Sequence, residues 1–195
     1  MIDADGLVLA AGRSSRMGSI NKVQAVLAGR TLLDHVVAKL TPQVDKLLVN
    51  GEKAICGDNA IADQVEGFKG PLVGLYSALI SDKLSSARYL MMTPCDGPFI
   101  PGDLVAALYR EIVAADADIA YVRYQGYAQP TFSLWHKRVT SAVEESLLVK
   151  HNGGFKPLMA SLNAVYLDWP EQGVNPFFNV NNLADLEEAE RLLCL

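Results

Sequence analysis

Gly6-Leu7-Val8-Leu9-Ala10 is an unbroken apolar run that leads directly into Ala11-Gly12-Arg13-Ser14-Ser15-Arg16-Met17-Gly18. Such a run is typical of a parallel strand that helices cover on both faces. The small residues that follow allow backbone N–H groups to approach an anion, and Arg13, Arg16 and Lys22 supply three cations nearby. Because open parallel sheets bind ligands beyond the carboxyl ends of their strands, this loop is predicted to hold a polyphosphate.

Spacing excludes two familiar phosphate-binding loops. A P-loop has Lys and Ser or Thr directly after its last glycine, whereas Lys22 follows Gly18 by four residues and Val23 comes after it. The dinucleotide-binding fingerprint Gly-x-Gly-x-x-Gly is also absent around Gly12. The local alternative that remains is an ordinary glycine-rich turn with solvated basic side chains.

Composition limits the class of protein. The 195 residues, half of them hydrophobic, predict a single domain over residues 1–195 with an ample core. We expect a cytoplasmic location, because no apolar run approaches the roughly 20 residues of a membrane helix and no basic segment precedes an apolar one at the start. The net charge of −5 argues against nucleic-acid or membrane partners. The three cysteines and three histidines lack the spacing of disulfide frameworks and zinc sites.

Helical and strand patterns alternate along the chain. Apolar stripes predict helices over residues 31–40, 71–79, 101–114, 139–149, 155–162 and 183–193. Apolar runs predict strands over residues 6–10, 46–50, 89–92, 118–122, 131–135 and 164–167, with a short strand near Gln64-Val65. His35 lies off its helix's apolar stripe and is expected at the surface. This alternation predicts an α/β fold with a mostly parallel sheet between two helical layers.

Asp96 is the carboxylate that the pattern singles out. It follows the apolar run Tyr89-Leu90-Met91-Met92 and lies between Pro94 and Pro98, where the chain must turn. One carboxylate together with substrate phosphates is the usual way to hold Mg²⁺, so Asp96 is a candidate metal ligand. The alternative is a turn-forming aspartate with no chemistry.

Asparagines form the second group of candidates. In an extended Asn179-Val180-Asn181, the two amides share a face, while Asn182 is expected to cap the following helix with Asp185. Asn50, at the end of a strand, and Asp63 are able to read a nucleobase, although both residue types are also common in plain loops. Cys95 is expected to be a small buried hydrophobe, because no histidine lies near it in sequence.

Four motifs occur in order along the chain: Leu9-Ala10-Ala11-Gly12-x-Ser14-x-Arg16-Met17-Gly18 with Lys22, Gly70-Pro71-Leu72-Val73-Gly74-Leu75, Pro94-Cys95-Asp96-Gly97-Pro98-Phe99-Ile100-Pro101 and Asn179-Val180-Asn181. Together they resemble the molybdenum cofactor guanylyltransferase family (MobA type). The resemblance spans nearly the whole chain in the right order. It implies a three-layer, Rossmann-like nucleotidyltransferase fold that transfers GMP from GTP to the phosphate of molybdopterin, releasing pyrophosphate with the help of Mg²⁺.

The resemblance also assigns roles position by position. Lys22, Arg16 and Asp96 would be catalytic, Asp96 would bind the metal, and Asn179 and Asn181 would lie at the pterin end of the cleft. The positions that would contact the nucleotide are Leu9, Ala10, Ala11, Gly12, Lys22, Asn50, Asp63, Gly70 and Asp96. The partners implied are GTP, molybdopterin and, transiently, other proteins of cofactor synthesis or cofactor acceptors.

Two departures from the family pattern keep alternatives open. The guanylyl branch usually has two glycines where this chain has Ala11-Gly12, and the alanine form is frequent in cytidylyltransferases. Asn21 stands where an aspartate often precedes the lysine. The alternatives are therefore a CTP-using enzyme, transfer to another phosphorylated small molecule, and a nucleotide-binding module without catalysis.

Overall fold

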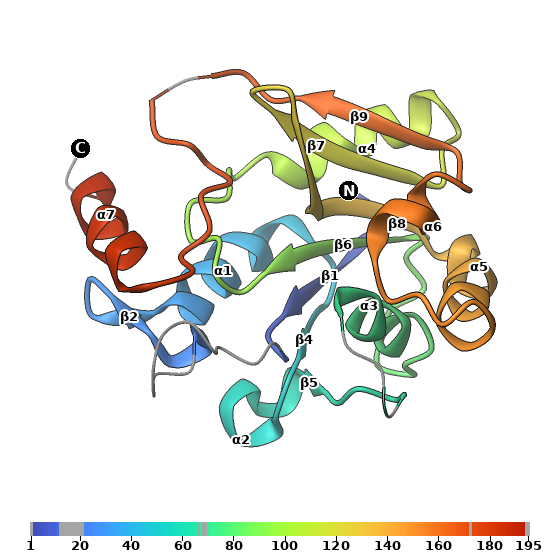
Figure 1. Cartoon of the computed structure of the whole chain (residues 1–195), viewed down its shortest axis with the longest axis horizontal. Helices are drawn as coiled ribbons and strands as arrows, with labels where there is room; N and C mark the ends of the chain where they lie inside the picture. Colours follow the sequence, from blue (N-terminus) through green and yellow to red (C-terminus); the bar gives the residue numbers. More distant parts are fainter. Residues whose placement is uncertain (1, 12–21, 66, 68–69, 172, 194–195) are drawn as a thin grey trace.

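A mixed sheet runs through the molecule with the strand order β5-β4-β1-β6-β8-β7-β9 (Figure 1). The computed structural model describes residues 2–11, 22–65, 67, 70–171 and 173–193. Strand β1 pairs in parallel with β4 and β6, whereas β8 runs antiparallel between β6 and β7. The predicted α/β architecture with a mostly parallel sheet is confirmed. The strands are β1 Ala4–Leu9, β4 Leu47–Asn50, β5 Ala60–Ile61, β6 Tyr89–Pro94, β7 Ile119–Tyr124, β8 Tyr127–His136 and β9 Ala164–Asp168.

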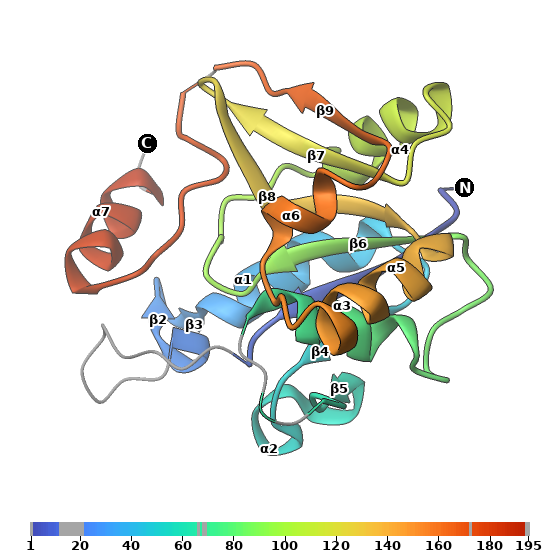
Figure 2. The same cartoon turned by 45° about the vertical axis from the view of Figure 1, so that its right-hand side comes forward.

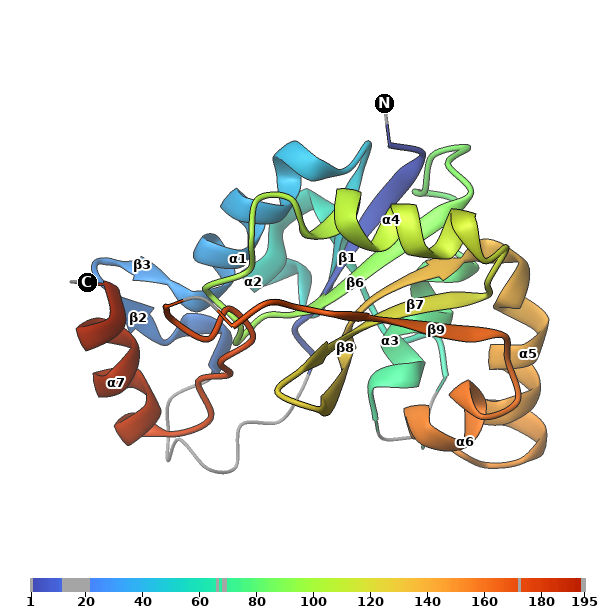
Figure 3. The ribbon, with the colours of Figure 1, turned by 90° about the horizontal axis from the view of Figure 1, so that it is seen from above.

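Helices cover both faces of this sheet (Figure 3). On one face lie α1 (Leu32–Leu40) and α4 (Leu104–Ala114), and on the other lie α3 (Pro71–Leu79), α5 (Thr140–Glu144) and α6 (Phe155–Met159). Two apolar clusters result, one on each side of the sheet, as a twice-covered parallel sheet requires. Among the described residues, no helix is both long enough and apolar enough to cross a bilayer.

A small hairpin and the last helix form a separate packing unit (Figure 2). Strands β2 (Val26–Leu27) and β3 (Arg30–Thr31) pair antiparallel, and α7 (Leu183–Leu193) packs on them through a cluster that joins Leu27 to Val180 and Ala189. The sequence patterns did not predict this hairpin, because strands of two residues are too short to show periodicity. The hairpin thus brings residues 183–193 beside residues 26–31.

Several expected boundaries are wrong. The edge strand is β5, not the stretch near Gln64-Val65, and a short helix α2 (Lys53–Cys56) precedes it. Helix α4 begins at Leu104 rather than residue 101, since Asp103 still lies outside helical geometry. The predicted helix over residues 139–149 is α5 followed by a π-helical turn. His35 is half-buried rather than at the surface, and its Nε2 lies 2.8 Å from the Leu27 carbonyl oxygen of the hairpin.

A buried ion pair fixes the amino end of the central strands. The Asp5 carboxylate of β1 is fully buried and accepts from the Lys137 ammonium at 2.8 Å and from the backbone and hydroxyl of Ser85 at 2.9 and 2.7 Å. All three bonds satisfy a charge that would be costly if left alone in the interior. This pair lies at the end of β1 opposite to its carboxyl end, so it serves the fold.

Thr93 of β6 gives a stability prediction. Its side chain is fully buried, and its hydroxyl has no hydrogen-bond partner among the described residues. A buried hydroxyl without a partner loses its hydration and gains nothing in return. Thr93→Val, which keeps the shape and removes the hydroxyl, is therefore expected to raise the free energy of unfolding by about 1 kcal/mol. Urea unfolding of both proteins measures the difference, and a Val variant less stable than the parent would contradict it.

Candidate active site

The carboxyl ends of three parallel strands meet at one edge of the sheet. At the end of β1, the Ala10 N–H donates to the Asn50 carbonyl of β4 at 2.9 Å. On the other side, the Cys95 N–H that follows β6 donates to the Leu9 carbonyl at 3.0 Å. These bonds continue the parallel ladders beyond the strands. They bring Leu9, Asn50 and Asp96, which directly follows Cys95, to the same edge of the sheet.

Lys22 joins two polar residues at this edge. Its ammonium donates to Asp96 Oδ2 at 2.9 Å and to Asn181 Oδ1 at 2.7 Å. The Lys22 and Asp96 side chains keep 19% and 15% of their surface exposed, so this charge pair is sheltered but open to a ligand. Asp96 and Lys22 lie 74 residues apart in sequence, and Lys22 and Asn181 lie 159 apart. The three side chains form what we call the lysine cluster.

The segment with the asparagines is held in place from both sides. The Val180 N–H donates to the Asp96 carbonyl at 2.8 Å, which attaches this segment to the end of β6. The Asp185 carboxylate accepts from the Asn181 N–H at 2.7 Å, and Asn182 Oδ1 accepts from the Asp185 N–H at 3.0 Å. The predicted capping of α7 by Asn182 is therefore confirmed. Capping of this helix fixes the backbone from which Asn181 reaches Lys22.

A second polar pair lies at the end of β4. Asn50 is only 3% exposed, and its Nδ2 donates to Asp63 Oδ1 at 2.9 Å and to the Ile61 carbonyl at 3.4 Å. Asp63 itself is exposed. The buried amide thus orients an accessible carboxylate, which presents acceptor oxygens toward solvent.

Gly70 directly precedes α3 and has a backbone conformation that favours glycine. Its φ of 129° lies in a region that side chains rarely adopt, and a Cβ there would lie 2.8 Å from the Gly153 carbonyl oxygen. No side chain caps the start of α3. Uncapped N–H groups at the start of a helix are able to bind an anion. The start of α3 therefore lies beside the segment around Gly153, although residues 70 and 153 are 83 positions apart in the sequence.

Comparison with known proteins identifies the family of this chain. A family model described as "MobA-like NTP transferase domain" matches residues 6–165. The chain belongs to this family. It is therefore a nucleotidyltransferase, which excludes the binding module without catalysis.

Relatives of this MobA-like domain are similar along almost the whole chain. A molybdenum cofactor guanylyltransferase from Bradyrhizobium sp. (strain ORS 278) is 35% identical over 97% of this chain and 93% of its own. A molybdenum cofactor guanylyltransferase from Rhodopseudomonas palustris (strain HaA2) is 36% identical over 95% of this chain and 90% of its own. The crystal structure of molybdopterin-guanine dinucleotide biosynthesis protein A from Archaeoglobus fulgidus superposes with a TM-score of 0.80 at 21% identity, covering 97% and 98% of the two chains. That structural likeness supports the fold.

The predicted nucleotide-binding loop follows β1. Gly12 and Arg16 lie outside the described residues. Ala10 is buried at the strand end, and Ala11 beside it is exposed. The structure thus brings Leu9, Ala10, Asn50 and Asp96 to one edge of the sheet.

Cys95 is poorly suited to act as a nucleophile. Burial, together with the neighbouring Asp96 carboxylate, raises the pKa of the Cys95 thiol to about 12. The thiol therefore stays protonated near neutral pH, and a protonated thiol is a poor nucleophile. The expectation that Cys95 is a small buried side chain is confirmed.

Gly74 is a position whose importance the sequence reasoning missed. It lies in the interior of α3, where a Cβ would collide with Asn50 Oδ1 and would lie 2.7 Å from Leu9 Cδ2. A glycine in the middle of an apolar helix is itself the signal, because it weakens the helix unless close packing requires it. Gly74 therefore allows α3 to approach the Asn50 side chain.

Gly74→Ala gives a test of this packing. The added methyl group is expected to push the Asn50 amide away from Asp63 and to raise KM for the nucleotide by about tenfold, with kcat changed less. Steady-state kinetics with varied nucleotide measures the effect. Gly102→Ala is the matched control, because a Cβ there meets no atom within 4 Å. Equal kinetics for the two variants would contradict the packing argument.

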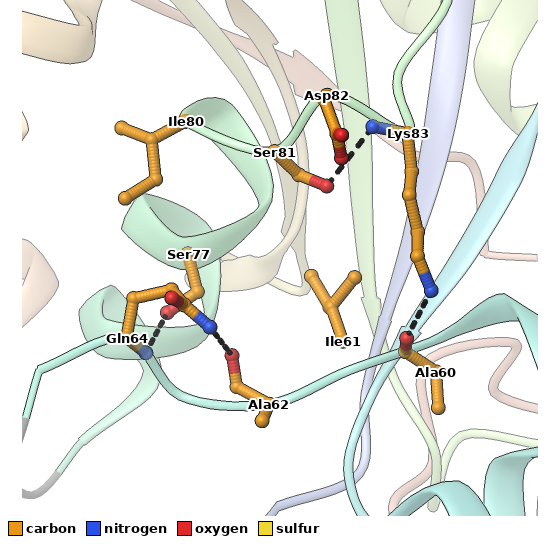
Figure 4. A pocket seen from close by; sticks show the side chains of 9 residues that line it. All are labelled: Ala60, Ile61, Ala62, Gln64, Ser77, Ile80, Ser81, Asp82 and Lys83. Atoms are coloured by element: carbon orange, nitrogen blue, oxygen red, sulfur yellow. Dashed lines mark hydrogen bonds between the residues drawn. The ribbon is translucent and has the colours of Figure 1, made fainter.

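A hollow of about 400 Å³ near the end of α3 is structural (Figure 4). The Lys83 ammonium on its wall donates to the Ala60 carbonyl at 2.9 Å, and Gln64 Nε2 donates to the Ala62 carbonyl at 3.1 Å. These two side chains bind backbone carbonyls of edge strand β5 and of Ala62, which follows it. Carbonyls that are already bound in this way are not available to pair with another chain. The hollow is lined by Ala60, Ile61, Ala62, Gln64, Ser77, Ile80, Ser81, Asp82 and Lys83.

Proposed function

We propose that this chain transfers GMP from GTP to the phosphate of molybdopterin, releasing pyrophosphate and forming the guanine dinucleotide form of the cofactor. The observation that carries the proposal is the lysine cluster. It places one cation and one carboxylate side by side at the carboxyl edge of the sheet. The names and nearly full coverage of the curated relatives support the choice of GTP and the molybdenum cofactor.

The residues at the edge suit a magnesium ion. Within the described part of the chain, no group of three His, Cys, Asp or Glu side chains is arranged to hold a metal. A single partly exposed carboxylate that already pairs with a cation, Asp96, matches the way Mg²⁺ is held by one carboxylate and substrate phosphates. When bound, Mg²⁺ would neutralise charge on the triphosphate. Asp96 would hold it.

Charge explains the reaction that the chain's own residues perform. A phosphate-monoester oxygen of the acceptor attacks the α-phosphorus of GTP, and the bond from that phosphorus to the bridging oxygen of pyrophosphate breaks. The attacking phosphate is largely ionised at neutral pH, since its second pKa is about 6, so no strong general base is needed. Lys22, which pairs with Asp96, would neutralise the negative charge of both reactants and hold the triphosphate in line.

The pair at the end of β4 favours guanine. An exposed carboxylate such as Asp63 accepts hydrogen bonds, and the Watson–Crick edge of guanine offers two adjacent N–H donors. Cytosine offers one amino donor beside two acceptors on that edge, which would face the Asp63 carboxylate unfavourably. Asn50 holds Asp63 in place from the buried side.

Assays with labelled nucleotides test the proposal. The purified protein is incubated with Mg²⁺ and either GTP or CTP labelled at the α-phosphate, with and without molybdopterin. We expect a labelled dinucleotide cofactor from GTP only when molybdopterin is present. Turnover of CTP without turnover of GTP would refute the guanine assignment, and label transfer to other phosphorylated acceptors but not to molybdopterin would refute the acceptor.

A further inference from the structure

Asn181 and Asn179 lie two residues apart but have different surroundings. Asn181 Oδ1 accepts from the Lys22 ammonium at 2.7 Å, whereas Asn179 Oδ1 is buried and has no hydrogen-bond partner among the described residues. A Cβ on Gly97 would lie 3.4 Å from this Asn179 oxygen. The resemblance treats both asparagines alike, as contacts of the acceptor. In the structure, Asn181 is the one of these two asparagines whose side chain accepts a hydrogen bond from Lys22.

The orientation of the Asn181 amide is fixed by its two partners. Its Nδ2 donates to the Asn179 carbonyl at 3.1 Å, and its oxygen faces the ammonium. A flipped amide would place two N–H donors against an ammonium that has no acceptor, and it would place its oxygen against a carbonyl. The backbone N–H of Asn181 is also held by Asp185 at 2.7 Å. Asn181 is thus a rigid acceptor aimed at Lys22.

We propose that Asn181 is a positioning residue that holds Lys22 at the phosphates of the nucleotide, and that it acts on the nucleotide side of the site. This inference rests on the proposed function. A lysine side chain has many rotamers, and each contact that restricts them reduces the entropy lost when a ligand binds. Asn181 supplies such a contact before the nucleotide arrives.

An uncharged acceptor suits this role better than a second carboxylate. In the structure, Lys22 is shared between Asp96 and Asn181. If a metal ion takes over the Asp96 carboxylate, the Lys22 ammonium loses that contact. The Asn181 amide still accepts from the ammonium, and because the amide carries no charge it leaves the full positive charge of Lys22 for the phosphates.

Nucleotide affinity in the absence of acceptor distinguishes the two roles. GTP with Mg²⁺ is titrated into wild type, Asn181→Leu, Lys22→Met and the double variant by calorimetry, with no molybdopterin present. We expect Asn181→Leu to weaken GTP binding by about tenfold, because a hydrogen bond to a charged group is lost. The double variant is expected to bind GTP as weakly as Lys22→Met alone, since Asn181 acts through Lys22.

Asn179→Leu is the matched comparison, because it changes the same residue type two positions away without touching Lys22. It is expected to leave GTP affinity within about twofold of wild type while raising KM for molybdopterin in the transfer assay. If the Asn181→Leu protein does not show cooperative thermal unfolding, Asn181→Ala takes its place in the same cycle.

Two results would overturn the inference. Normal GTP affinity in the Asn181 variant, with loss confined to molybdopterin, would make Asn181 an acceptor contact. A double variant weaker than Lys22→Met by the full effect of Asn181→Leu would mean that Asn181 acts on the nucleotide or its metal independently of Lys22. Either result leaves the proposed function standing, whereas wild-type protein that binds no GTP would refute the proposed function itself.

Discussion

Asp96→Asn is expected to lower kcat for guanylyl transfer by about 10³-fold while the protein stays folded. The Asp96 carboxylate is the proposed ligand of the metal, and an amide oxygen carries no charge with which to hold that metal against the triphosphate. The fold should survive, because the amide oxygen still accepts from Lys22 in place of the carboxylate at 2.9 Å. Single-turnover transfer with saturating GTP measures the effect, and thermal unfolding checks the fold.

Asp45→Asn is the control for this prediction. The Asp45 N–H donates to the Ala4 carbonyl, which places this exposed aspartate at the amino end of the sheet. Its variant removes the same charge far from the carboxyl edge and is expected to keep its activity. Full transfer by Asp96→Asn would remove Asp96 from the metal site.

Lys22→Met is expected to lower kcat/KM for GTP by about 10²- to 10³-fold, which corresponds to the roughly 2.7–4 kcal/mol that one well-placed electrostatic contact supplies to a transition state. Met keeps most of the length of the side chain but brings no charge to the reacting phosphates. Without Lys22, the Asp96 carboxylate also repels the triphosphate until a metal ion neutralises it. Steady-state kinetics at varied GTP measures the loss.

Lys83→Met removes an equal charge away from the site. The Lys83 ammonium donates to backbone carbonyls at the β5 edge, so its variant separates the loss of a specific contact from a general change in net charge. We expect unchanged kcat/KM in this control. Equal losses in both lysine variants would show that Lys22 acts only through net charge.

The sequence predicts the layers of the fold and the edge that carries the site. Apolar runs identify the central strands β1, β4 and β6, because buried parallel strands need apolar residues on both faces. Polar residues placed directly after those runs, Asn50 and Asp96, are then expected at the same edge, and the structure places them there. For Asn50 and Asp96, the place directly after a buried strand is enough to predict the edge of the sheet at which the residue lies.

Other parts depend on contacts that the sequence does not encode locally. The order of β8 and β7 in the sheet follows from pairing between distant strands, and two-residue strands such as β2 and β5 carry no periodicity. The contact of Lys22 with Asn181 requires α7 to pack on the hairpin, which involves residues from both ends of the chain. The close approach of Gly74 to Asn50 likewise depends on how α3 lies on the sheet.

The separation of 159 residues between Lys22 and Asn181 has a consequence for biosynthesis. During synthesis, Lys22 and Asp96 leave the ribosome well before Asn181 does. The lysine cluster is therefore complete only after Asn181 has left the exit tunnel, and until then the chain lacks the contact that holds Lys22 for the nucleotide. The site is expected to gain its full affinity for nucleotide in a late folding step, when the segment that carries Asn181 docks against the end of β6.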